Sequence, residues 1–320
     1  MKLSAHQDTL QLSQPFGISR GVKTSAEVVR VQISDGSALG LGEAVPYARY
    51  GDSSDKALSQ IAKLPNDFSR HDLTELLPAG SARNAVDAAL LDLESKVAGQ
   101  PAWKVLGLAE PQPVEMCYTI SLQQTEKMIA EAQQCADLPV LKVKLGGQDD
   151  QAAILGIAEA APDSKIIVDV NEGWNIDTLK GMIPYLVQAG VELLEQPIPA
   201  AQDNQLALLD CPIPLCADEG ISPGMEIRDV CPSYSFVNLK LDKSGGLTHA
   251  LEQLNQARDL GLGVMVGCMV GSSLAMAPGF LLAQQADYVD LDGFLHIAQD
   301  TAPALRFESG LLSAPEGLWG

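Results

Sequence analysis

Five charged residues recur at nearly even intervals through the middle of the chain, each at the end of a short apolar run. They are Lys144, Asp169, Glu195, Asp218 and Lys240, and consecutive members lie 22 to 26 residues apart. One strand–helix unit of a parallel barrel takes about 25–30 residues, so these side chains are predicted to end successive strands at one mouth. Three carboxylates flanked by two lysines can hold a divalent cation with an amine on either side, which predicts an enzyme.

The three acids offer only carboxylate oxygens, and no His or Cys lies immediately beside them. Such ligands favour Mg²⁺, or Mn²⁺ as a substitute, and argue against a structural zinc. Any one of the five residues alone would be interpreted as a solvated strand end or a structural ion pair. Five in successive strands favour a site.

The two lysines come before and after the acids along the chain, so a closed barrel places Lys144 and Lys240 across the mouth from each other. An amine near a cation and a second lysine is expected to have a lowered pKa and to act as a base. A substrate carboxylate on the metal would stabilise the enediolate that forms when an α-proton leaves. Bases on opposite faces then predict inversion at the α-carbon.

The elements that must position these residues alternate between short apolar strands and amphipathic helices from about residue 113. The predicted strands are MCYTI, LKVKL, IIVDV, LLEQP, PLCAD, FVNLKL, GVMVGC and YVDLDG, and the helices between them include 125–136, 179–190 and 247–261. About eight such units predict an α/β fold, a TIM-type, modified (β/α) barrel over residues 113–296.

Residues 1–112 lack this alternation. Hairpin-like strands (LQLSQPFG, EVVRVQISDG, ALGLGEAVP) precede a helix over residues 81–98 that is predicted to end at Gly99. We expect an α+β N-terminal capping domain over residues 1–112, to which residues 297–320 return.

Composition narrows the function further. The formal net charge is −20, which argues against a nucleic-acid surface. No basic segment followed by an apolar stretch opens the chain, and no apolar run approaches the roughly 18 residues of a membrane span. Six cysteines without a CxxC pair predict reduced thiols in a cytoplasmic protein. The four histidines (His6, His71, His249 and His296) are expected to lie outside this set of lysines and acids, which argues against a histidine base.

Residues two apart on a strand point to the same face of the sheet. Further charged or polar residues are therefore expected to lie in pairs on one face. The pairs are Lys142 with Lys144, Asp169 with Asn171, Lys240 with Asp242, and Asp290 with Asp292. The segment YVDLDGFL contains no Lys or Arg, so its two acids are expected to repel each other unless a cation lies between them.

With these residues in place, the chain resembles the enolase superfamily, in its muconate lactonizing enzyme subgroup, and most closely the bacterial dipeptide (L-Ala-D/L-Glu) epimerases. The motifs KxK, DxN, EQP, ADE and KxDK[ST]GG occur in this order in LKVKLG, DVNEGW, LLEQPIP, CADE and NLKLDKSGG. The later DLDG narrows the resemblance to dipeptide epimerases.

The resemblance implies a magnesium-dependent epimerase that inverts the α-carbon of the C-terminal residue of a dipeptide, with Ala-Glu from peptidoglycan turnover as the expected substrate. It implies that Lys144 and Lys240 are the acid/base pair and that the three acids bind the metal. It places Lys142 at the substrate carboxylate, Asp290 and Asp292 at the α-ammonium, and Arg20 at the glutamate side chain. It also places Thr119 and Cys268 in contact with the substrate. Asn171 and Glu219 are expected to support the metal ligands. Arg20 could equally be a surface arginine, because cap loops vary in length.

Three alternatives stay open. The chain could be an o-succinylbenzoate synthase or N-acylamino acid racemase, whose substrates lack the ammonium that Asp290 and Asp292 would bind. It could be a dipeptide epimerase of other specificity, or a non-catalytic barrel retained for binding. The expected partner is a small-molecule dipeptide, with no nucleic acid and no membrane, and a homo-oligomer is compatible with the sequence.

Overall fold

Eight parallel strands form one sheet, in the order β12-β11-β10-β9-β8-β7-β6-β5, in the computed structural model, which describes residues 1–315 and 317–320. The strands are β5 (Tyr118–Ile120), β6 (Val140–Lys144), β7 (Lys165–Asp169), β8 (Val191–Glu195), β9 (Leu215–Ala217), β10 (Phe236–Lys240), β11 (Gly263–Gly267) and β12 (Tyr288–Asp290). The backbone N–H of Cys117 donates to Val289 O at 2.8 Å, so the sheet nearly closes between β5 and β12. The predicted TIM-type barrel is confirmed.

A helical segment follows each of these strands. These segments are α5 (Thr125–Gln134), α6 (Asp150–Ala160), α7 (Ile176–Gln188), η3 (Ala200–Leu208), η4 (Ile227–Asp229), α8 (Leu241–Ser244), α9 (Leu247–Asp259), α10 (Ser273–Ala283) and η5 (Asp292–His296). Helix α7 begins earlier than predicted because the Asn175 side chain caps it by accepting from Thr178 N at 2.8 Å. No helix in the described part of the chain is long and apolar enough to cross a bilayer.

The barrel interior has an apolar layer beneath a charged one. Six buried side chains from successive strands pack together at the lower level, namely Cys117, Val140, Ile167, Leu193, Cys216 and Met265. Side chains of one strand alternate between the helices and the barrel axis, so the next inward positions lie one layer nearer the mouth. Lys142 and Asp169 occupy two of these positions and are fully buried.

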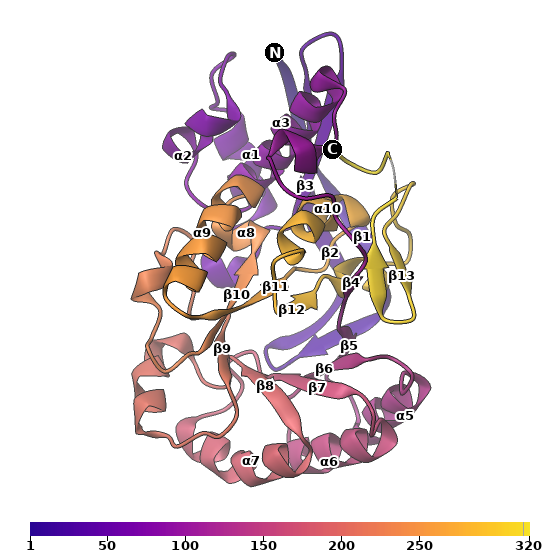
Figure 1. Cartoon of the computed structure of the whole chain (residues 1–320), viewed down its shortest axis with the longest axis vertical. Coiled ribbons are helices and arrows are strands. Elements are labelled where there is room, and N and C mark those ends of the chain that lie inside the picture. The colour runs from indigo at the N-terminus through magenta and orange to yellow at the C-terminus, as the bar shows by residue number, and fades with distance from the viewer. Residues whose placement is uncertain (316) are drawn as a thin grey trace.

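The cap lies at one end of the molecule, opposite α5, α6 and α7 (Figure 1). Its sheet contains β1 (Lys2–Ile18), β2 (Gly21–Ser34) and β3 (Leu39–Ala44), followed by η1 (Ala48–Tyr50), α1 (Ser54–Ile61), η2 (Arg70–Asp72), α2 (Leu73–Leu76), α3 (Ser81–Ala98) and α4 (Ala102–Val105). Helix α3 ends, as predicted, at Gly99, whose φ is 60°. A Cβ on Gly40 or Gly42 would lie 2.0 or 2.1 Å from backbone oxygens of α3, so these glycines let the helix pack closely against β3.

The C-terminal segment contacts both parts of the molecule. Strands β13 (Arg306–Glu308) and β14 (Leu311–Ser313) form a small antiparallel sheet with β4 (Val114–Glu115), just before β5. Beyond them, Trp319 Nε1 donates to Ala88 O at 3.1 Å and Gly320 N donates to Asp92 Oδ1 at 2.8 Å. These bonds attach the tail to α3, near the C label in Figure 1.

Candidate active site

Strand register brings the predicted metal ligands together at the mouth of the barrel. Lys144 on β6 is aligned with Asp169 on β7, which is aligned with Glu195 on β8. Asp218 directly follows β9. Carboxylate oxygens of the three acids lie within 4.8 Å of one another, and all three residues are buried.

This donor set fits a hard divalent cation. Glu195 Oε2 is buried and has no hydrogen-bond donor of suitable geometry among the described residues, although the Lys142 ammonium lies 2.7 Å away. Burial, and after it the charge of Asp169, raises the pKa of Glu195 to about 7. Three all-oxygen ligands that repel one another are stabilised by Mg²⁺, which prefers carboxylates and leaves further positions for other oxygens.

Two lysines contact these carboxylates from opposite walls. Lys144 Nζ donates to Asp169 Oδ2 at 2.5 Å, and Lys240 Nζ donates to Asp218 Oδ2 at 2.8 Å. Their strands, β6 and β10, are four places apart in the eight-stranded sheet, which is half a turn of a closed barrel. The predicted arrangement across the mouth is therefore present.

The charges of these groups depend on one another. Burial would lower the pKa of Lys240, but Asp218 and Glu195 raise it well above its ordinary value. The lowered lysine pKa expected from the sequence therefore requires the positive charge of a bound cation. Burial would also raise the pKa of Asp218, but Lys240 and a further lysine, Lys243, hold it well below its usual range.

The backbone turns sharply after β7 and β8. Asn171, Glu172 and Gln196 have φ values of 47°, 65° and 33°, a region that residues other than glycine seldom adopt. The turn after β7 presents a polar group to the site: the Asn171 side-chain amide lies 3.3 Å from both Asp169 Oδ2 and Glu219 Oε1. Asn171 and Glu219 thus lie beside the predicted metal ligands, and their role in supporting these ligands stays a prediction. Strained backbone of this kind is often found where a binding site is held in place.

The pair expected to bind an ammonium group is already matched by other residues. Asp290 Oδ2 accepts from Lys142 Nζ at 2.5 Å. Asp292 Oδ2 accepts from Thr119 N at 2.7 Å and lies 3.4 Å from His296 Nε2. The segment YVDLDGFL supplies neither base, so both partners come from outside it.

His296 lies outside the set of lysines and acids, but it lies against Asp292 and lines the cavity described below. The expectation for Asp242 was wrong. Asp242 does not share the site with Lys240, because β10 ends at Lys240 and α8 begins at Leu241. Its carboxylate instead accepts from Val45 N at 2.9 Å and Asn84 Nδ2 at 2.8 Å, in the cap.

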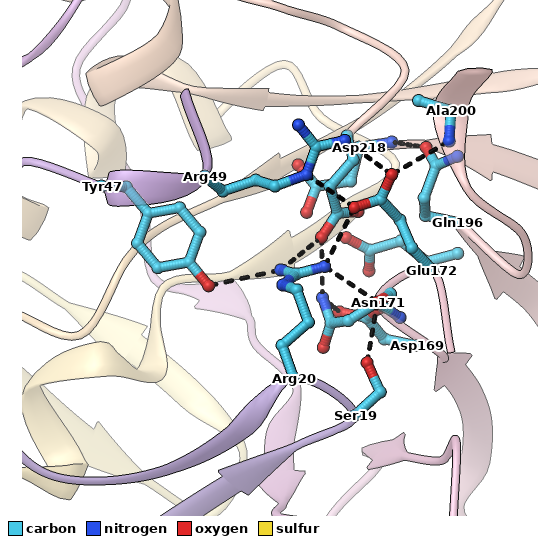
Figure 2. Close-up of polar contacts among 12 residues, drawn as sticks. Ser19, Arg20, Tyr47, Arg49, Asp169, Asn171, Glu172, Gln196, Ala200 and Asp218 are labelled. Atoms are coloured by element: carbon cyan, nitrogen blue, oxygen red, sulfur yellow. Dashed lines mark hydrogen bonds and ion pairs between the residues drawn. The ribbon is translucent and has the colours of Figure 1, made fainter. Parts of the chain in front are cut away.

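The connection between β1 and β2 covers the mouth and carries Arg20. The guanidinium lies 2.7 Å from Glu219 Oε1, donates to Asn171 O at 2.8 Å, and donates to the Tyr47 hydroxyl at 3.2 Å (Figure 2). Ser19 Oγ also donates to Asn171 O, at 2.8 Å. Arg20 is therefore at the mouth, but its donors are held by the protein's own acceptors, and its contact with a substrate stays a prediction.

A second arginine links the cap to the same barrel loop. Arg49 donates to both oxygens of Glu172, at 2.7 Å each, and Glu172 Oε1 also accepts from Ala200 N at 2.9 Å (Figure 2). Bidentate pairs of this geometry fix orientation as well as adding binding energy. The cap is thus attached to the loop after β7 at two points.

A cavity of about 900 Å³ lies between the cap and the mouth. The predicted residues that line it are Arg20, Thr119, Lys144, Asn171, Asp218, Glu219, Lys240, Cys268, Asp290 and Asp292. Asp169, Glu195 and Lys142 lie beneath this lining and are fully buried. Lys23 also lines the cavity, with its ammonium 4.4 Å from the centre of the Tyr47 ring.

Two residues that contact the acids were given no role by the sequence analysis. Lys243 Nζ donates to Asp218 Oδ1 and to Asp218 O, both at 2.7 Å, and Asn238 Nδ2 donates to Glu195 Oε1 at 2.7 Å. Asn238 is two residues before Lys240, so strand alternation could have identified it. Gly267 on the next strand leaves it room, because a Cβ there would lie 2.5 Å from Asn238 Oδ1. Lys243 lies on α8, which the alternation does not describe.

Comparison with known proteins gives two family matches. Residues 2–107 match the mandelate racemase / muconate lactonizing enzyme N-terminal domain, and residues 124–318 match the enolase C-terminal domain-like family. Among curated relatives, N-acetyl-D-glutamate racemase of Pseudoalteromonas sp is 41% identical, over 92% of this chain and 95% of that protein. L-Ala-D/L-Glu epimerase of Escherichia coli (strain K12) is 36% identical, over 96% of this chain and 97% of its own length.

A solved structure is also very similar. An enolase family member from Agrobacterium tumefaciens, described as homologous to dipeptide epimerases and containing bound sodium and L-Ala-L-Glu, superposes with a TM-score of 0.96. It is 41% identical, and the match covers 99% of each chain. Both parts of the fold are covered by these matches. The chain therefore belongs to the mandelate racemase / muconate lactonizing enzyme family of the enolase superfamily.

Proposed function

We propose that this protein is an epimerase that inverts the α-carbon of the glutamate residue in L-Ala-D/L-Glu by moving a proton between two lysines. The observation that carries the proposal is the position of Lys144 and Lys240 on opposite walls of the barrel, with the buried carboxylates between them. Removal of an α-proton from one face and delivery to the other requires one base and one acid in this arrangement.

Asp169, Glu195 and Asp218 would hold Mg²⁺, with Mn²⁺ as a substitute. When bound, the cation supplies positive charge that stabilises the negative charge developing on the substrate carboxylate as the α-proton leaves. Lys142, which is buried among acids and whose pKa those acids raise well above its ordinary value despite burial, would remain charged and hold the same carboxylate. Lys144 and Lys240 would exchange roles with the direction of reaction, one accepting the proton and the other donating it.

The side chain of the glutamate residue needs a cation at the cap side of the cavity. Arg20 was predicted for this role, and it is held here by Glu219 and Asn171. Lys23 lines the same cavity and forms no ion pair within the described residues. We propose that Lys23 supplies the charge for the glutamate side chain and that Arg20 holds the cap on the barrel.

One observation favours a second candidate, racemisation of an N-acylglutamate. Asp290 and Asp292 already have Lys142 and His296 as partners, so the site does not require an ammonium group on the substrate. A relative of 41% identity is named N-acetyl-D-glutamate racemase. Ala-Glu and N-acetylglutamate are both glutamates acylated on nitrogen, so the lysines would act on either in the same way.

Exchange of the α-proton with solvent tests the proposal. The protein with Mg²⁺ is incubated in heavy water with L-Ala-L-Glu, L-Ala-D-Glu, the two N-acetylglutamates and, as a control, free glutamate. We expect deuterium at the glutamate α-carbon and conversion between the stereoisomers for the acylated compounds. Exchange with none of the acylated glutamates would contradict the proposal and favour the non-catalytic barrel.

Further features stay predictions. The division into residues 1–112 and 113–296, with residues 297–320 returning to the first part, can be tested by limited proteolysis. Location in the cytoplasm and assembly into a homo-oligomer can be tested by cell fractionation and by light scattering.

A further inference from the structure

His296 has an unusual position for a residue outside the lysine–carboxylate set. Its Nε2 lies 3.4 Å from Asp292 Oδ2, and its side chain is 15% exposed. The same ring lies 4.6 Å, centre to centre, from Phe16 of β1 at an interplanar angle of 59°. His296 therefore lies between the acid at the end of the barrel and the cap strand that covers it.

The backbone around His296 is fixed by the same cap strand. Ser13 Oγ donates to His296 O at 3.1 Å, and Leu12 forms an isolated bridge with Ile297. The imidazole nevertheless keeps an unsatisfied nitrogen, because Nε2 is buried and has no hydrogen bond of good geometry within the described part of the chain. A small shift of the ring or of a bound ligand could therefore change its partner without disturbing the backbone.

Among the described residues, the charged groups that act most strongly on this ring are acidic. They are Asp292 on the same turn, Asp290 on β12 and Glu131 on α5, whose carboxylate lies 3.2 Å from the Tyr118 hydroxyl. Burial would lower the pKa of His296, but these three acids, Asp292 first, raise it above its ordinary value. In its imidazolium form the ring neutralises one of the two acids at this end of the cavity.

The other acid has a different partner. Asp290 is paired with Lys142, which is also in contact with Glu195 and Asp169. With His296 protonated, each of the two aspartates has a cationic partner, which lowers the negative charge that they present to the cavity. A substrate whose acyl group carries an ammonium gains little binding free energy from such a surface. An uncharged acyl group loses no binding free energy there.

We infer that His296 determines which acyl group the site accepts, by competing with the substrate's ammonium group for Asp292. The inference rests on the proposed function, since it assumes that the substrate is a glutamate acylated on nitrogen. While His296 is bound to Asp292, uncharged acyl groups are accepted. An alanyl ammonium binds only by displacing the imidazole from Asp292. His296 is thus a specificity residue, and it takes no part in moving the α-proton.

Two compounds that differ by one amino group test this directly. L-Ala-L-Glu and N-propionyl-L-glutamate have the same carbon skeleton, and only the former carries an ammonium. Kinetics with His296→Gln, which removes the charge, and His296→Leu, which also removes the polar atoms, should raise the kcat/KM ratio of the dipeptide over the propionyl compound at least tenfold (roughly 1.4 kcal/mol). His249→Gln is the matched control, because it removes a histidine–carboxylate pair with Glu252 on an exposed surface.

The pairing itself can be measured without substrate turnover. NMR titration of the four histidines should show one imidazole with a raised pKa that disappears in His296→Gln. The same imidazole should titrate at lower pH in Asp292→Asn. This measurement also stands if one of the kinetic variants fails to fold.

The outcomes separate the inference from the function on which it rests. Activity of the wild-type protein on neither compound would contradict the proposed function, whatever the titration shows. Activity on both, with a ratio that His296→Gln and His296→Leu leave unchanged, would overturn the inference alone. Equal loss of both activities in a folded variant would overturn the inference as well, because the effect of His296 would then not depend on the acyl group of the substrate.

Discussion

Replacing one lysine at a time separates the two halves of the proton transfer. We consider Lys144→Met and Lys240→Met, since methionine preserves much of the side-chain volume while removing the amine. Loss of a general acid or base typically lowers the rate by about 10²–10⁴, which corresponds to about 2.7–5.4 kcal/mol in the barrier. We expect epimerisation to fall by at least the lower of these factors in each variant.

The structure predicts that this loss is not caused by unfolding. In Lys240→Met, Asp218 keeps Lys243, with two contacts of 2.7 Å. In Lys144→Met, Asp169 keeps Lys142 at 3.2 Å and the Asn171 N–H at 2.9 Å. Because no carboxylate is left without a partner, the free energy of unfolding should fall by less than about 2 kcal/mol, below the 3–5 kcal/mol expected for an uncompensated buried charge.

The assay combines chiral chromatography with NMR detection of deuterium at the α-carbon, using each glutamate stereoisomer separately. Each variant should exchange the proton of one stereoisomer through its remaining lysine, and the two variants should prefer opposite stereoisomers. Lys165→Met is the control, since that exposed lysine pairs with Glu115 far from the mouth and should leave activity unchanged. Epimerisation at near wild-type rate in either variant, or the same stereoisomer preference in both, would refute the two-base reasoning.

Three other perturbations have defined results. Chelation should abolish turnover, and added Mg²⁺ or Mn²⁺ should restore it. A free metal concentration of 100 times its Kd should also raise the free energy of unfolding by about 2.7 kcal/mol over the metal-free protein. Full activity in EDTA would exclude the metal. Burial raises the pKa of Asp242 to about 7, so the group binds its proton more tightly in the folded state and its stabilising contribution is lost as pH rises toward 7. The free energy of unfolding in urea should fall by up to about 1.4 kcal/mol per pH unit between pH 5 and 7, and Asp242→Asn should remove this pH dependence. If the variant keeps the same pH dependence, a group other than Asp242 causes it. Lys23→Ala should lower kcat/KM for Ala-Glu about tenfold relative to Ala-Leu, because only the former has a side-chain carboxylate. Arg20→Ala should lower kcat/KM for both substrates. The reverse pattern would show that Arg20, and not Lys23, binds the glutamate side chain.

The barrel and the reactive centre could be predicted because both depend on local patterns. Strand alternation and a repeat of 22 to 26 residues determine which side chains end adjacent strands, and the observed register aligns Lys144, Asp169 and Glu195 accordingly. The alternation fails where a strand stops, which is why Asp242 was placed wrongly. Asp292 follows β12 in a short helical turn, yet it reaches the cavity because Thr119 N holds its carboxylate.

Contacts between distant segments could not be predicted in this way. His296 packs against Phe16 of the cap, and its carbonyl accepts from Ser13, which is 283 residues earlier in the chain. Lys142 reaches Asp290 across the junction between the first and last strands. No local pattern encodes which acid meets which base in the assembled barrel, so the neutralisation of the DLDG acids is apparent only in three dimensions.

The pairing of acids with bases at the mouth also affects how a substrate arrives. Each of the three metal ligands, together with Glu219, Asp290 and Asp292, has a basic partner within 3.4 Å. The chain's net charge of −20 must therefore come mainly from the rest of the molecule. An acylated glutamate is itself an anion, so it approaches against a repulsive field that extends about 10 Å at 0.1 M salt. Added salt should thus speed encounter, and more for the dianionic N-acetylglutamate than for the singly charged dipeptide, the opposite of an enzyme that attracts its substrate through its surface charge.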